Sequence, residues 1–314
     1  MGKHIRIIWN KNRKWVLFVF GLSIVLFLIY FCVPAPDTVM TVEARTRAIE
    51  FEVINPTAAS IRFAVPVCVK RTPRDNGEFL TGFVEPMPGA KALYRFYGDY
   101  LILRYINGEK VAARFSTGNP RAAIDLTGAA TISLVEGCER GSKPAAQPMR
   151  LPIWGSASMG EVVTSATDVG KASDQGGILL GGAVQLFGKT TTLSFWGNSR
   201  PELYFAAKIE LPVGSRLAGE REETGGAAWW GFALYSGWSE PTAANAALDV
   251  AASSEAKRLV LSRMGSQHRG EVLEVGYFVQ VFNDPLYLRI QLLIVGIFGI
   301  LQFVHVIKEL SSKD

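Results

Sequence analysis

Two apolar segments, one near each end of the chain, constrain this sequence more than any other feature. Residues 15–33 read WVLFVFGLSIVLFLIYFCV, nineteen residues without a charged side chain. At about 1.5 Å of rise per residue, a helix of this length crosses a hydrocarbon core of about 30 Å. Residues 287–307, YLRIQLLIVGIFGILQFVHVI, contain only Arg289 as a charged residue, at an edge where its side chain reaches the headgroups. We therefore expect two transmembrane helices.

A cleaved signal peptide is the alternative interpretation of residues 15–33. Signal peptides carry a shorter apolar region of about 7–15 residues. The only tolerable small-residue site, Val33-Pro34-Ala35, is followed directly by Pro36, which is a poor context for cleavage. We favour an uncleaved anchor.

The distribution of basic residues predicts the orientation. No acidic residue occurs before Asp37, whereas the N-terminal tail carries Lys3, Arg6, Lys11, Arg13 and Lys14. The positive-inside rule keeps this tail, residues 1–14, in the cytoplasm, and two spans return residues 308–314 to the same side. In a bacterium this is a two-pass inner-membrane protein with its bulk in the periplasm. The net charge of +5 comes largely from the tail, so we expect no nucleic-acid partner.

The region between the apolar segments has the alternating pattern of strands. Val42, Ala44 and Thr46 alternate with charged residues, and the phase changes at Ala48-Ile49, which predicts a bulge or a bend. Further on, Asn107-Gly108 between two alternating runs predicts a hairpin.

Composition divides this region into three parts. Residues 38–140 predict a small antiparallel sandwich or barrel. Residues 141–177 are rich in Gly, Ser, Ala and Pro and predict a linker or a long loop. Residues 178–285 carry short strands punctuated by glycines and predict a second β domain. The expected fold is mainly β, with two antiparallel sandwich- or barrel-like extracytoplasmic domains bracketed by transmembrane helices.

The three cysteines predict one disulfide. Cys68 and Cys138 occupy strand-like positions in a compartment inferred to be oxidising, so a bond between them is expected. Two separately buried thiols are the alternative. Cys32 lies in the first apolar segment and has no predicted partner.

Polar residues define one face of the second apolar segment. At 100° per residue, Gln291, Gln302 and His305 share a face, and Gly296 and Gly299, roughly 80–140° away around the helix, also leave room for a neighbouring helix. We expect this face to pack either on the first span of the same chain or on another subunit.

The titratable residues do not form a recognisable catalytic set. Of the three histidines, only His268 is extracytoplasmic, in a predicted turn. Glu50 and Glu52 share the exposed face of one predicted strand, where solvated carboxylates are the norm. We therefore predict no catalytic residues, no metal ligands and no cofactor, and expect that the protein is not an enzyme.

The stretch GGAVQLFGKTTT, residues 181–192, fits a relaxed P-loop pattern. A P-loop needs a turn after a strand and then a helix, whereas residues 184–187 are an apolar run and β-branched residues follow. We expect a strand, a turn at Gly188-Lys189 and another strand, and no bound nucleotide.

Aromatic residues cluster in AAWWGFALYSGW. In a strand, Trp230 and Phe232 share one face, while Trp229 and Ala233 take the other. One set enters the core; an exposed Trp229 or Trp238 would contact a sugar ring, a partner or the membrane surface.

Three functions are consistent with these observations. The first is a non-catalytic scaffold or accessory subunit of a cell-envelope assembly, with the bilayer and other membrane proteins or further copies of the chain as partners. The second is a module that binds glycan or peptidoglycan. The third is an envelope hydrolase whose carboxylates the sequence does not single out.

Overall fold

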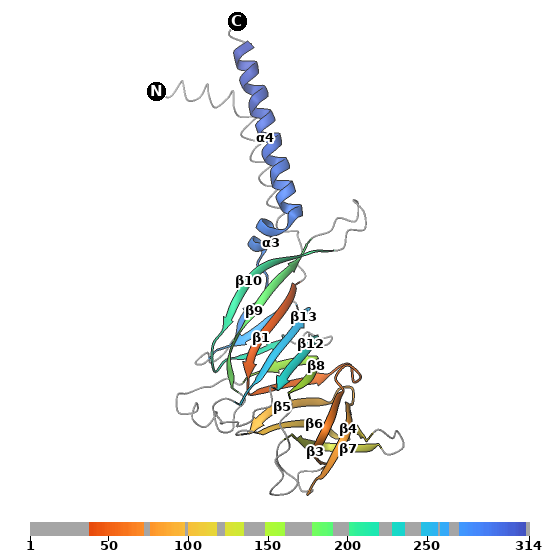
Figure 1. Ribbon diagram of the computed structural model, residues 1–314. Helices are drawn as coiled ribbons and strands as arrows, with labels where there is room; N and C mark the ends of the chain where they lie inside the picture. Colours follow the sequence, from red (N-terminus) through yellow and green to blue (C-terminus); the bar gives the residue numbers. More distant parts are fainter. Residues whose placement is uncertain are drawn as a thin grey trace. The chain divides into compact units, whose positions relative to one another are not determined.

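The computed structural model describes a β-rich body that continues into two helices (Figure 1). Its described residues are 38–71, 76–97, 100–117, 123–134, 148–160, 178–190, 201–219, 228–235, 246–256, 258–263 and 270–311. All of them belong to one compact unit, Asp37–Asp314.

One half of the sheet contains strands from the beginning and from the second half of the chain. Its order is β10 (Leu203–Leu211), β9 (Leu179–Lys189), β1 (Thr38–Thr46), β13 (Leu248–Ser254), β12 (Ala228–Tyr235) and β8 (Met149–Met159). Every pairing in this series is antiparallel. Three short strands continue from β8: β11 (Arg216–Gly219), β14 (Leu259–Ser262) and β15 (Glu271–Leu273).

The other half of the sheet closes on itself. Its order is β2 (Ala48–Val53), β5 (Lys91–Tyr97), β6 (Tyr100–Ser116), β4 (Glu78–Pro86), β3 (Ile61–Lys70) and β7 (Ile124–Ser133). Because β6 also pairs with β7, the strands β6, β4, β3 and β7 form a ring. The rings of Phe63 and Phe115 are both buried and stack with their centroids 6.3 Å apart.

The predicted change of phase near Ala48-Ile49 marks the passage between the two halves. β1 ends at Thr46, Arg47 forms a bend, and β2 begins at Ala48. The Arg47 backbone contacts both halves, since its N–H donates to Ile178 O at 2.9 Å and its carbonyl accepts from Phe96 N at 2.9 Å. The bend is confirmed, and with it a mainly antiparallel β fold.

Two local predictions are wrong. The segment 141–177 is not all linker, because residues 149–159 form β8, which bonds to both β12 and β2. Asn107-Gly108 does not end a strand, because β6 continues through it. Gly108 adopts φ +57°, the register against β7 shifts between Ile106 and Val111, and Asn107 Nδ2 donates to Val111 O at 2.8 Å. The dipeptide forms a bulge instead of a turn.

Two helices end the described chain. Residues 277–282, YFVQVF, belong to the region 178–285 in which short strands are predicted, but they lie in helix α3 (Tyr277–Asn283), and α4 (Pro285–Ser311) follows. Within α4, residues Tyr287–Val304 are long and apolar enough to cross a membrane. One of the two predicted apolar helices is therefore present; residues 15–33 lie outside the described residues, so that span stays a prediction.

Candidate functional site at the junction of sheet and apolar helix

Helices α3 and α4 meet at Asp284 and Pro285. Asp284 has an extended backbone, with φ −76° and ψ 121°, as a residue before proline prefers. Its N–H donates to Gln280 O at 2.8 Å, and its carbonyl accepts from Leu288 N at 3.2 Å. Pro285 fills the first position of α4, where a missing N–H costs nothing. One residue thus ends α3 and starts α4, which changes the chain direction.

The junction buries polar side chains against strand β10. Gln280 is 2% exposed, Asp284 0% and Tyr204 of β10 9%. Burial, together with the nearby Asp284 and Tyr287, raises the pKa of Tyr204 to about 12. Helix α3 packs on β10 and on α4. The apolar helix is therefore joined to the sheet through buried contacts.

Gly188 makes room for Tyr204. The two residues are directly opposite each other on β9 and β10, and a Cβ at position 188 would overlap the Tyr204 ring. The strand predicted for this stretch is confirmed, although β9 extends through Lys189, where a turn was expected. The Lys189 ammonium lies 3.3 Å from Glu255 Oε1. In the P-loop-like stretch, Gly188 therefore allows the Tyr204 ring to pack, and Lys189 forms an ion pair.

Gln291 bonds within the chain. Its Nε2 donates to Val281 O of α3 at 3.2 Å. Gln302, Gly296 and Gly299 of the predicted helix-contact face are exposed, and a Cβ on either glycine would meet nothing within 4 Å. The His305 side chain is not among those described. Packing of this face on another helix stays a prediction.

The cysteine pair is described on one side only. Cys68 of β3 is 2% exposed and takes part in a disulfide. Cys138 and Cys32 both lie outside the described residues, so the pairing of Cys68 with Cys138 stays a prediction.

The structure corrects the assignment of exposed tryptophans. Trp229 is 0% exposed and belongs to the core, so it cannot stack on a ligand. Trp238 lies outside the described residues. The exposed tryptophan among the described residues of this region is Trp154 of β8, 36% exposed, which pairs in register with the partly exposed Trp230 of β12; Phe232 of β12 is also exposed, at 38%. Sequence reasoning missed Trp154 because residues 141–177 were expected to be a linker.

Glu50, one of the two carboxylates predicted on an exposed strand face, is solvated. Glu50 lies 3.7 Å from the Lys91 ammonium, with both side chains about half exposed. Within the described part of the chain, no three His, Cys, Asp or Glu side chains are placed to hold a metal ion. His268 lies outside that part.

Comparison of the chain with protein-family models, with curated proteins and with solved structures finds no match.

Proposed function

We propose that the protein is a non-catalytic, membrane-anchored β protein that acts as a scaffold or accessory subunit of a cell-envelope assembly. The observation that carries this proposal is the junction just described. A helix long enough to span a bilayer leaves its apolar side chains exposed, Leu292 at 71% and Phe303 at 66%, while its base is fixed to the sheet through buried contacts. Such a helix holds the β body in a fixed position at the membrane surface.

The topology belongs to the same proposal. Residues 15–33 form a second anchor, both termini are cytoplasmic, and the strands lie in the periplasm of a bacterium. An oxidising periplasm is also the compartment in which the proposed Cys68–Cys138 bond would persist.

Crosslinking in intact cells tests the scaffold role. A photo-crosslinking amino acid at Gln302, on the exposed polar face of α4, is expected to capture either a defined membrane protein or the first span of the same chain. The matched control is Ile297, 47% exposed and about 140° away around the helix. A chain that stays uncrosslinked at both positions and retains sugar polymers would contradict the scaffold role.

A glycan-binding module is the second candidate, and the Trp154–Trp230 pair favours it. Paired indole rings on an outer sheet face suit stacking on sugar rings. Trp154→Ala is expected to abolish binding of the full chain to isolated cell-wall polysaccharide, whereas Phe205→Ala, at a 55% exposed aromatic of β10, is the control that keeps it. Equal binding by both variants would remove this candidate.

A further inference from the structure

Helix α3 exposes two phenylalanines on one face. Phe278 is 72% exposed and Phe282 64%, and residues four apart lie one above the other on a helix. Gln280, between them in sequence, is 2% exposed and points the other way. Exposed aromatic side chains gathered on one face indicate a contact surface.

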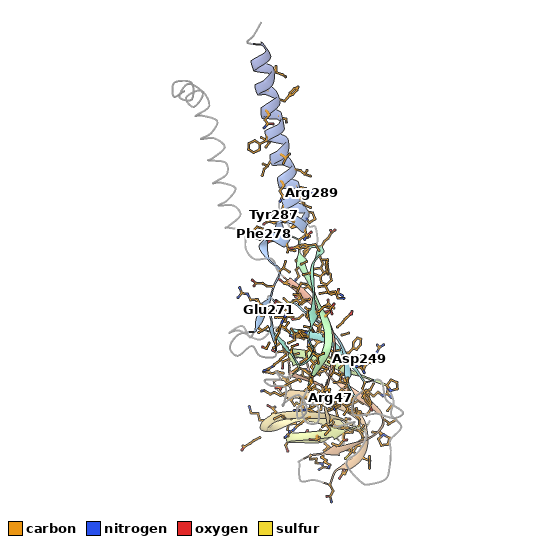
Figure 2. The ribbon with its side chains drawn as sticks, turned by 90° about the vertical axis from the view of Figure 1, so that its left-hand side faces the viewer. Arg47, Asp249, Glu271, Phe278, Tyr287 and Arg289 are labelled. Carbon is orange, nitrogen blue, oxygen red and sulfur yellow. The ribbon has the colours of Figure 1, made fainter. Side chains whose placement is uncertain are left out.

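Three observations fix the level of α3 along α4. Asp284 joins the two helices, and Gln291 Nε2 donates to the carbonyl of Val281 at 3.2 Å. In addition to burial, Asp284 and Tyr287 both lie near enough to Tyr204 of β10 to raise the pKa of its phenol. At about 1.5 Å of rise per residue, Gln291 lies only about 3 Å beyond Arg289. Figure 2 shows Phe278 beside the first turns of α4, which carry Tyr287 and Arg289. Helix α3 thus lies at the level of Arg289.

That level is the surface of the bilayer if α4 spans one, as in the proposed function on which this inference rests. The eighteen residues Tyr287–Val304 measure about 27 Å along the helix, which is close to the thickness of the hydrocarbon core. The exposed Arg289 is the one charge in this window and belongs among the headgroups. Helix α3 then lies at the boundary between headgroups and acyl chains.

The charge of α3 suits that location. The segment YFVQVFN contains no ionisable side chain other than the Tyr277 phenol, and the adjacent Asp284 is fully buried. Among the described residues, the two carboxylates that precede α3 are paired, since Glu274 lies 2.8 Å from Arg258 and Glu271 2.7 Å from Arg263. Immersing the exposed face of α3 among lipids therefore desolvates no charge on the helix itself.

We propose that α3 is an interfacial helix whose Phe278 and Phe282 insert into the headgroup–acyl boundary of the bilayer that α4 spans. Interfacial helices bury their apolar face about 5–10 Å into this boundary. Helix α3 in the plane of the membrane and α4 along its normal together fix the orientation of the β body at the bilayer surface.

Photo-crosslinking to lipid tests this proposal on the full chain. The chain is reconstituted in vesicles of phosphatidylethanolamine and phosphatidylglycerol, with p-benzoylphenylalanine placed singly at Phe278, Phe282, Leu292 or Phe79. Leu292 reports on the span, and Phe79, 43% exposed on β4, is a matched aromatic in the half of the sheet that carries neither helix. After irradiation, intact mass identifies lipid adducts.

Lipid adducts at positions 278, 282 and 292, severalfold above those at 79, are the expected result. Adducts at 292 but not at 278 and 282, or capture of a second copy there, would overturn the interfacial helix and leave the anchor standing. Absence of lipid adducts at 292 would overturn the anchor and the interfacial helix together. Equal adducts at 79 would show contact without specificity and also overturn the proposal.

Discussion

At the scale of single residues, Gly188 shows how one motif admits two interpretations. Gly188-Lys189-Thr190 matches part of a phosphate-binding pattern, and its apolar surroundings predicted a strand, which is confirmed. Why a glycine is required at position 188 was not predictable, because the side chain that needs the space, Tyr204, lies on the next described strand. Only the pairing of β9 with β10 brings its ring over position 188.

Gly188→Ala is expected to lower the free energy of unfolding by about 1–3 kcal/mol, because the added methyl group displaces the Tyr204 ring. Gly276→Ala is the control, since a Cβ there meets nothing within 4 Å and φ is −70°. Urea unfolding of the detergent-solubilised chain measures both. In the Tyr204→Ala background the Gly188 substitution should cost less, and equal stability of the two glycine variants would contradict this packing role.

Two buried phenols predict sensitivity to alkali. Burial raises the pKa of Tyr94 and Tyr105 well above the ordinary value. Above a pH of about 10 the unfolded chain releases these protons while the folded chain keeps them, so stability is complete below that pH and falls as the pH rises. Tyr105→Phe should flatten the decline in unfolding free energy above about pH 10. Parallel curves for the variant and the parent chain would contradict it.

At the scale of secondary-structure elements, alternation predicted most strands but not where they end. A hairpin at Asn107-Gly108 was a reasonable expectation, since the dipeptide favours positive φ. Gly108 does adopt positive φ, yet β7 pairs with β6 on both sides of it and holds the strand together. For α3, alternation in YFVQVF also fits a strand, and only its contacts with β10 and α4 select the helix.

The paired strands β12 and β8 illustrate the two faces of the sheet. Trp229→Ala is expected to cost about 3–5 kcal/mol of unfolding free energy, because it empties a fully buried site. Trp154→Ala, at the partly exposed indole opposite Trp230, should cost less than about 1 kcal/mol. Thermal unfolding of the two variants compares them directly, and losses of equal size would contradict the assignment of faces.

At the scale of the whole molecule, the order of strands along the sequence differs from their order in the sheet. β1 comes from the predicted first domain, 38–140, yet it pairs with β9 and β13 of the predicted second, 178–285. β8, from the predicted linker, joins β12 to β2. Composition locates strands, but these pairings connect residues far apart in the sequence, and no local pattern encodes them.

Because β1 pairs within one half of the sheet and leads directly into β2 of the other, we expect the stabilities of the two halves to be coupled. Val42→Ala, at a fully buried position of β1, should cost about 1–3 kcal/mol. Hydrogen exchange should then speed up in β9 and β13 and also in β2 and β5, because the chain passes directly from β1 through Arg47 into β2. Faster exchange confined to β9 and β13 would show that the two halves open independently.

Membrane topology is the most direct test of the proposed anchoring. A reporter enzyme that is active only outside the cytoplasm is fused to the chain after Gly141 in one fusion protein and at Asp314 in another. Because α4 is proposed to return the chain across the bilayer, the first fusion should be active and the second inactive, at equal expression. An inactive reporter after Gly141, or an active one at Asp314, would contradict the proposed membrane-anchored β protein.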